Sequence, residues 1–251
     1  MSSWALVTGA TAGIGESFSR LLASHNYNIV LIARDLARLE ERAKNLEEKY
    51  GIQTQVIQAD LATDEGCMKI EKYIAENHID VLINNAGNAH GLDPIQTGNL
   101  DDWDAMIDIN LKGLLYVSRA IIPNMVARES GHIINIGSTA AKEVYPNGNV
   151  YCATKHAVDS LNQAMRIDLN PYGIRVGAIH PGMVDTEFST VRFKGDKEKA
   201  ANVYKGFSPL QAEDLADIIH FVVTRPYHVN IADLVVMPTA QAMVSIVKRN
   251  L

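Results

Sequence analysis

The sequence predicts a single α/β domain in which a doubly wound parallel sheet of about seven strands is flanked by helices. Short apolar runs alternate with amphipathic stretches of about 12–20 residues along most of the chain. Most of these runs are continuously apolar, which is typical of strands buried on both faces of a parallel sheet. The chain has 251 residues, 47% of them hydrophobic and 21% charged, which suits one domain with a substantial core.

Seven short apolar segments are the expected strands. A turn or an amphipathic stretch long enough for a helix follows most of them, as in repeated βα units. No proline- or serine-rich linker, internal repeat or low-complexity tract interrupts this order, so we expect one domain over residues 1–251. The expected strands are Trp4–Val7, Asn28–Ala33, Thr54–Gln58, Asp80–Asn84, His132–Gly137, Arg175–Ile179 and Asp233–Met237.

Residues 184–208 depart from the alternating pattern, because they are polar, rich in lysine and weakly periodic. They lie between the end of the sixth expected strand and the next helix. In an open α/β sheet this position borders the binding crevice. We therefore expect a substrate lid over residues 184–208, with an exposed insertion as the alternative.

Charge and composition exclude several kinds of partner. The net charge of −6 argues against nucleic-acid binding. The eight histidines include no i,i+4 pair supported by carboxylates, so no metal is expected. Cys67 and Cys152 are far apart and are interpreted as free thiols.

The start of the chain and its apolar runs favour a cytoplasmic protein. No run approaches the roughly 18 apolar residues of a membrane span, so no membrane partner is expected. The first three residues lead directly into the apolar segment Trp4–Val7, which leaves no room for a signal peptide. A small-molecule partner is the remaining expectation.

A glycine-rich loop follows the first expected strand and opens the first helix. Its glycines permit a tight turn and a close approach of the backbone to a ligand. The helix N-terminus behind the loop offers unpaired N–H groups and partial positive charge to a phosphate. This strand–turn–helix context favours dinucleotide binding over a plain connecting turn. The loop residues expected to contact the cofactor are Gly9, Thr11, Ala12, Gly13, Ile14 and Gly15.

The end of the second expected strand indicates which dinucleotide is bound. NAD-selective enzymes commonly place an acidic residue here, whereas an arginine accommodates a 2′-phosphate. This chain has Ala33 and then Arg34, and Arg38 is close enough in sequence to assist. Asp35 begins the next helix and is interpreted as its cap. The sequence therefore favours NADP, with NAD as the alternative.

Two further strand ends carry candidate cofactor contacts. Asp60-Leu61 ends the third expected strand, where the carboxylate is able to reach an adenine amino group or simply form a turn. Asn84-Asn85-Ala86-Gly87 closes the fourth, and its amides and small residues suit a close-packed nucleotide or a turn equally well. From this segment Asn85, Ala86 and Gly87 are expected to contact the cofactor.

Tyr151 and Lys155 are the candidates for proton transfer. On a helix, positions i and i+4 share one face, so both side chains can point into one pocket. Lowering a tyrosine pKa from about 10 to about 7 requires roughly 4 kcal/mol. A unit charge about 4 Å away supplies this at an effective dielectric of about 20. Taken alone, the spacing equally fits a surface tyrosine beside a solvated lysine.

Ser138 and Asn110 complete the candidate catalytic set. Ser138 follows the fifth expected strand, and its hydroxyl is placed to hold a substrate oxygen while Tyr151 exchanges the proton. Asn110 begins the apolar helical stretch Leu111–Ile122 and is placed to position a water that links Lys155 to solvent. Taken alone, either residue would be interpreted as a cap or a buried polar group.

These motifs, in this order and spacing, resemble the short-chain dehydrogenase/reductase family over essentially the whole chain. The resemblance implies a Rossmann fold with Tyr151 as general acid/base. It further implies that Lys155 lowers the pKa of Tyr151 and binds the nicotinamide ribose, that Ser138 orients the substrate and that Asn110 supports a proton relay. The nicotinamide end is then held by residues 181–186, where the expected contacts are Pro181, Gly182, Val184 and Thr186.

The last third of the chain resembles NADP-dependent 3-hydroxy acid dehydrogenases, which act on serine, allo-threonine or 3-hydroxypropionate. The likeness rests on Thr186–Asp196, Asn230–Asp233 and Met237–Thr239. A guanidinium on a mobile lid can bind a carboxylate bidentately, so Arg192 is the expected substrate carboxylate ligand, with an exposed arginine as the alternative. Asp35 and His180 differ from the residues expected in these relatives, and His180 has no assigned role.

The sequence therefore predicts an NADP-dependent oxidoreductase that moves a hydride between nicotinamide and a small 3-hydroxy acid or its semialdehyde. One alternative is a carbonyl reductase or alcohol dehydrogenase of bulkier neutral ketones, aldehydes or polyols. A non-catalytic dinucleotide sensor is the alternative of another class. The resemblance also implies a homotetramer. His90, after the fourth expected strand, is interpreted as a solvated loop residue.

Overall fold

A seven-stranded parallel sheet forms the centre of the computed structural model, which describes residues 3–250. The strand order is β3-β2-β1-β4-β5-β6-β7, and every neighbouring pair is parallel. The fold class predicted from the sequence is confirmed. The strands are β1 (Trp4–Thr8), β2 (Asn28–Ala33), β3 (Thr54–Gln58), β4 (Val81–Asn84), β5 (His132–Ile136), β6 (Arg175–Pro181) and β7 (Asp233–Val236).

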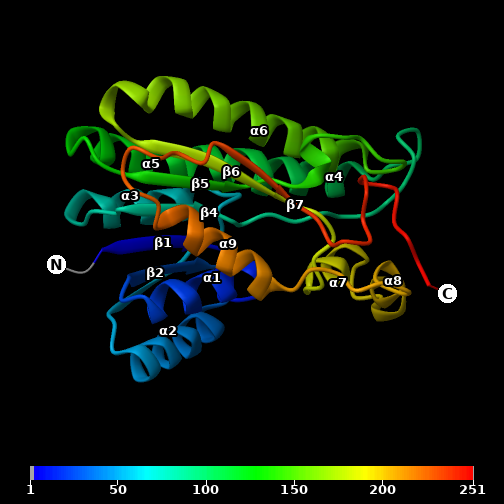
Figure 1. Ribbon diagram of the computed structural model, residues 1–251, viewed down its shortest axis with the longest axis horizontal. Helices are drawn as coiled ribbons and strands as arrows, with labels where there is room; N and C mark the ends of the chain where they lie inside the picture. Colours follow the sequence, from blue (N-terminus) through cyan, green and yellow to red (C-terminus); the bar gives the residue numbers. More distant parts are fainter. Residues whose placement is uncertain (1–2, 251) are drawn as a thin grey trace.

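Helices cover both faces of the sheet (Figure 1). On one face, α1 (Gly13–Ser24), α2 (Leu36–Tyr50) and α9 (Ala212–Val223) bury one apolar cluster. On the other face, α3 (Asp64–Glu76), α5 (Leu114–Ala127) and α6 (Asn149–Leu169) bury a second. The continuously apolar strands β1, β2, β4 and β5 are buried because both faces are covered.

Short side chains fix where several helices begin. Asp35 caps α2 by accepting a hydrogen bond from the backbone N–H of Arg38 at 3.1 Å, as the sequence predicts. Gly51 ends the same helix in the left-handed conformation, which glycine adopts without strain. Thr63 and Asn99 cap α3 and α4 (Leu100–Ile107) in the same way.

The helix around Asn110 differs from the sequence-based expectation. Asn110 does not begin a helix. It lies inside a six-residue π-helical segment, Asp108–Gly113, which joins α4 to α5. A π-helical turn inserts an extra residue and rotates the following side chains, and such turns are frequent at functional sites. The insertion leaves the Asn110 side chain buried.

The segment 184–208 is more structured than its weak periodicity indicates. It contains two short helices, α7 (Phe188–Arg192) and α8 (Lys197–Val203), which Figure 1 shows beside each other near the C-terminal end of the chain. The remaining short elements are the 3₁₀ turns Thr139–Ala141 and Asn170–Tyr172. Within residues 3–250, no helix has both the length and the apolar character needed to cross a membrane.

Candidate active site

A cavity of about 1090 Å³ lies at the carboxyl ends of the strands. Parallel strands of an open α/β sheet place their following loops at one edge, where ligands bind. Of the residues singled out from the sequence, those lining the cavity are Gly9, Thr11, Ala12, Gly13, Ile14, Arg34, Arg38, Asp60, Leu61, Asn85, Ala86, Gly87, Ser138, Tyr151, Lys155, Pro181, Gly182, Val184, Thr186 and Arg192.

The glycine loop leaves the N-terminus of α1 open to the cavity. Gly9 and Gly13 have φ angles of +67° and +52°, a left-handed conformation that favours glycine. Ala12, at the N-cap, provides no side-chain cap, so N–H groups of the first turn are available to an anion. Gly15 does not line the cavity; its Cα packs so closely that an added Cβ would lie 2.3 Å from the Gly9 carbonyl oxygen.

Arg34 supplies free positive charge beside this loop. It is exposed, lines the cavity and makes no ion pair within residues 3–250. Arg38 has its head group 3.4 Å from the Glu187 carboxylate, which links α2 to the segment 184–208. The carboxylate of Asp35 is engaged as the cap of α2. This arrangement fits a phosphate group on the adenosine ribose better than a bare 2′-hydroxyl.

Asp60, after the end of β3, is placed both to form a turn and to contact a nucleotide. Its Oδ1 accepts a hydrogen bond from the N–H of Ala62 at 3.0 Å, which is a turn-forming role. The same residue lines the cavity, within reach of a bound nucleotide. Asn85 is held at the end of β4 because its Nδ2 donates to the Thr8 carbonyl at 2.9 Å.

Tyr151 and Lys155 are both buried on the cavity side of α6. Lys155 Nζ donates to the Ile136 carbonyl at 3.0 Å and lies 6.0 Å from the centre of the Tyr151 ring. Burial lowers the pKa of Lys155 to about 8. Burial is also the largest influence on Tyr151 and raises its pKa, whereas Arg192 and the Ser138 hydroxyl act in the opposite direction. The net direction is opposite to the lowering expected from Lys155.

Ser138 and Asn110 occupy different places relative to the cavity. Ser138 lines it and caps the turn Thr139–Ala141, its Oγ accepting from the Ala140 N–H at 3.1 Å. Asn110 does not line it. Its Oδ1 accepts from the Asn88 N–H and its Nδ2 donates to the Asn88 carbonyl, both at 2.8 Å. Asn110 thus supports the cavity wall from behind, and the proposed water relay stays a prediction.

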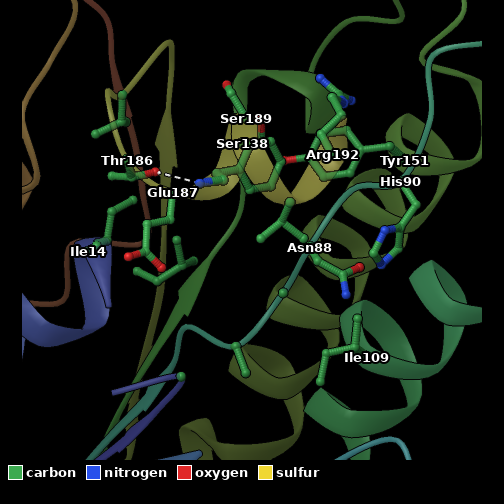
Figure 2. A pocket seen from close by; sticks show the side chains of 18 of the residues that line it. Ile14, Asn88, His90, Ile109, Ser138, Tyr151, Thr186, Glu187, Ser189 and Arg192 are labelled. Carbon is green, nitrogen blue, oxygen red and sulfur yellow. Dashed lines mark hydrogen bonds between the residues drawn. The ribbon is translucent and has the colours of Figure 1, made fainter. Parts of the chain in front are cut away.

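Arg192 lies over the candidate catalytic tyrosine (Figure 2). Its guanidinium carbon is 5.1 Å from the centre of the Tyr151 ring and 5.6 Å from those of Tyr145 and Phe188. One guanidinium nitrogen donates a hydrogen bond to the Tyr145 hydroxyl. Nε is buried and has no hydrogen-bond partner within the described part of the chain. The aromatic rings and Tyr145 therefore hold the guanidinium in the cavity with donor capacity left over.

The segment 184–208 is fastened across the cavity by contacts on both sides. The Gly91 N–H donates to the Arg192 carbonyl at 3.0 Å, and Lys194 pairs with Asp102 at 2.9 Å. The Arg38–Glu187 ion pair fastens the opposite side, near the glycine loop. These contacts join the segment to α2, to α4 and to the loop after β4, each of which contributes residues to the cavity lining.

Two residues of the site were missed or misread from the sequence. Tyr145 was not singled out, although it stands six residues before Tyr151 in the loop that follows Ser138. The interpretation of His90 as a solvated loop residue is wrong, since it is partly buried and lines the cavity. Packing of the segment 184–208 against the loop of His90 explains this burial, which lowers the pKa of His90.

Comparison with known proteins supports the likeness read from the sequence. A family profile described as short chain dehydrogenase matches residues 3–197. The NADP-dependent 3-hydroxy acid dehydrogenase of Salmonella typhi is 43% identical over 243 residues, 94% of this chain and 95% of that protein. Its counterpart from Schizosaccharomyces pombe is 42% identical over 241 residues, 94% of this chain and 92% of that protein.

A solved structure is similar over nearly the whole chain. The closed form of serine dehydrogenase complexed with NADP⁺ has a TM-score of 0.90 and 40% identity, and the match covers 99% of this chain and 100% of that one. The likeness therefore includes the segment 184–208 as well as the sheet.

Proposed function

The chain belongs to the short-chain dehydrogenase family, and we propose that it oxidises small 3-hydroxy acids, or reduces the matching semialdehydes, with NADP. The curated relatives at 42–43% identity are named for NADP and 3-hydroxy acids, and the similar solved structure is a serine dehydrogenase with NADP⁺. These names favour the acid substrate over the bulkier neutral ketones and polyols considered as alternatives. They also argue against a non-catalytic sensor.

NADP fits the residues around the glycine loop. The uncapped N-terminus of α1 would bind the pyrophosphate, and Arg34 would bind the 2′-phosphate with help from Arg38. Asp60 and Leu61 would hold the adenine end, and Pro181, Gly182, Val184 and Thr186 the nicotinamide end; these six residues all line the cavity. When bound, NADP supplies the hydride acceptor, or the donor in the reverse direction; the protein supplies position and electrostatics.

Tyr151 exchanges the proton in this proposal. Oxidation of an alcohol removes a hydride from the carbon and a proton from the hydroxyl, and Tyr151, acting as the phenolate, accepts that proton. Ser138 holds the substrate oxygen next to the phenol. Lys155 stabilises the phenolate and contacts the nicotinamide ribose, while Asn110 supports the route by which the proton leaves.

The position of Arg192 carries the assignment of an acid substrate. Its guanidinium stands over the Tyr151 ring, Arg192 lines the cavity, and its Nε has no hydrogen-bond partner among the described residues. A carboxylate bound there has its β-carbon within reach of the phenol, as a 3-hydroxy acid requires. Residues 184–208 then act as a lid that brings this guanidinium to the substrate and excludes water.

A substrate panel tests this proposal. NADP reduction is measured with serine, allo-threonine and 3-hydroxypropionate, and with the neutral alcohols 1,3-propanediol and 1,3-butanediol. A kcat/KM for the acids at least tenfold above that for the neutral alcohols is expected. Equal values for both groups, or a preference for the neutral alcohols, contradict the acid assignment and favour the carbonyl reductase.

A homotetramer in the cytoplasm is part of the same proposal. Leu115 and Tyr116 on α5 and Ile167 on α6 are exposed apolar side chains on helices that the family uses for assembly. Cys67 and Cys152 are both free thiols, as is usual in a reducing compartment. Sedimentation equilibrium of the purified protein and fractionation of cells test the two statements; a monomer or a membrane-associated pool contradicts them.

A further inference from the structure

His180 is a fully buried histidine that contacts the backbone carrying Ser138. It lies in β6, directly before Pro181, and its side chain has 0% exposure. Its Nδ1 is 3.2 Å from the Ser138 carbonyl oxygen. A carbonyl oxygen only accepts hydrogen bonds, so Nδ1 must carry the hydrogen. The ring also fills the space beside Gly137, where an added Cβ would lie 2.3 Å from Nδ1.

The other edge of the ring faces three charged side chains, Lys142, Asp159 and Asp233, called here the charged cluster. Nε2 is 3.0 Å from Oδ1 of Asp233 and 3.5 Å from Oδ1 of Asp159, but it makes no in-line hydrogen bond. Lys142 Nζ is 2.7 Å from Asp233 and 3.1 Å from Asp159. The Lys142 ammonium therefore supplies the positive charge that balances the two carboxylates.

The link from His180 to Ser138 is present in either charge state of the ring. Burial is the largest influence and lowers the pKa of His180, with Lys142 acting in the same direction and the two aspartates in the opposite one. Protonation would add a hydrogen at Nε2, facing the charged cluster, and leave the Nδ1 hydrogen in place. The bond to the Ser138 carbonyl therefore does not depend on that titration.

The Ser138 carbonyl oxygen accepts two hydrogen bonds, one from the Ala141 N–H and one from the His180 ring, and the two connect it to different parts of the fold. The Ala141 N–H donates at 2.9 Å and closes the local turn. The His180 ring donates from β6 and ties that turn to the sheet. Because the Ser138 Oγ is also fixed, by the Ala140 N–H at 3.1 Å, the orientation of the residue is determined at both its carbonyl and its hydroxyl.

We propose that His180 is a positioning residue for Ser138: through its Nδ1–H and the charged cluster behind it, it holds Ser138 in the orientation that presents its hydroxyl to the substrate oxygen. The inference rests on the proposed role of Ser138 and does not depend on which 3-hydroxy acid is the substrate. A displacement of about 1 Å at such a group is enough to slow turnover about 100-fold.

His180→Phe is the first test, since phenylalanine keeps a ring beside Gly137 and removes the donor. We expect kcat with serine or 3-hydroxypropionate to fall about 10- to 100-fold, while the Kd of NADPH, measured by fluorescence titration, stays within about twofold. His132→Phe is the matched control, because His132 is 2% exposed, lies at the start of β5 away from Ser138, and neither ring nitrogen has a partner among the described residues.

A double-mutant cycle separates positioning from general structural damage. In a Ser138→Ala background, His180→Phe should cause less than about a twofold further loss, because the two residues act as one unit. Multiplicative losses, or a His180→Phe enzyme with kcat within twofold of wild type, overturn the proposal. If Ser138→Ala leaves kcat unchanged, the role of Ser138 itself is wrong, which is a separate outcome.

A second pair of variants keeps the test decisive if His180→Phe does not fold. His180→Asn places an amide donor near the position of Nδ1, whereas His180→Leu has a similar size and no donor. We expect His180→Asn to retain a kcat at least fivefold above that of His180→Leu, with similar Kd values for NADPH. Equal kcat values for the two variants overturn the proposal.

Discussion

Replacing Arg192 by alanine should weaken the use of 3-hydroxy acids and largely spare neutral alcohols. In the structure the guanidinium donates to the Tyr145 hydroxyl and lies over the Tyr151 ring, and its Nε is buried without a partner. A substrate carboxylate bound there would accept two charge-assisted hydrogen bonds from the guanidinium. Truncation to alanine removes both bonds and leaves the carboxylate facing aromatic rings.

The magnitude follows from these contacts. A hydrogen bond to a charged group contributes about 1.5–3 kcal/mol. Because the arginine is only partly buried, about 2–4 kcal/mol for the bidentate pair is a reasonable total, or about 30- to 1000-fold in kcat/KM. Neutral alcohols make no ion pair with the guanidinium and lose only its effect on the Tyr151 ring and on the Tyr151 pKa, so a loss below about fivefold is expected for them. Arg192 also acts to lower the pKa of Tyr151, so its removal should shift the optimum for alcohol oxidation to higher pH.

Steady-state kinetics with matched substrates measure the effect. KM and kcat are compared for 3-hydroxypropionate and 1,3-propanediol in wild type, Arg192→Ala and Arg192→Lys. Lys199→Ala is the control for loss of one positive charge on the same segment, since Lys199 is exposed and pairs with Asp196 at 3.5 Å. Equal losses for the acid and the diol in Arg192→Ala would refute recognition of the carboxylate.

Three other substitutions test the cofactor and proton-transfer assignments. Tyr151→Phe should lower kcat at least about 1000-fold, while the Kd of NADPH, measured by fluorescence titration, stays near the wild-type value. Retained turnover contradicts the acid/base role. Arg34→Ala should raise KM for NADP about 10- to 100-fold and leave KM for NAD nearly unchanged, which kcat/KM with both cofactors checks. Lys155→Met should be inactive yet more stable at pH 7. The folded pKa of Lys155, about 8, lies below its ordinary 10.5. The free energy of unfolding of the wild type therefore rises as the pH increases from 8 to 10.5. The variant exceeds it by up to about 3 kcal/mol at pH 7, and this difference shrinks over the same pH range. Urea unfolding at pH 7 and pH 10 measures this, and equal stabilities at pH 7 would contradict it.

Much of the cofactor half of the site could be predicted from the sequence. The glycine loop, Arg34, Asp60 and the segment after β4 all follow strands of the sheet, and parallel strands end at one edge by topology alone. The assignment of Asp35 as a helix cap was also correct, because the cap is a local interaction between residues three apart.

The electrostatics of Tyr151 and Lys155 could not be read from their spacing. An i,i+4 pair shares a helix face, but the distance between the charged atoms depends on where each side chain finds partners. Lys155 turns to the Ile136 carbonyl, and burial then dominates the pKa of both groups. Likewise, the burial of Asn110 depends on a π-helical insertion for which the apolar pattern gave no signal.

The sequence by itself determined the fold class, the positions of the strands along the chain, the glycine loop and the candidate proton-transfer pair, because these depend on periodicity and short-range spacing. Only the tertiary structure decided that Tyr145 fastens Arg192 over Tyr151 and that His180 reaches Ser138 from a neighbouring strand. These contacts join residues 42 and 47 positions apart. Their partners are chosen by packing at the sheet edge, and no local pattern in the chain encodes that choice.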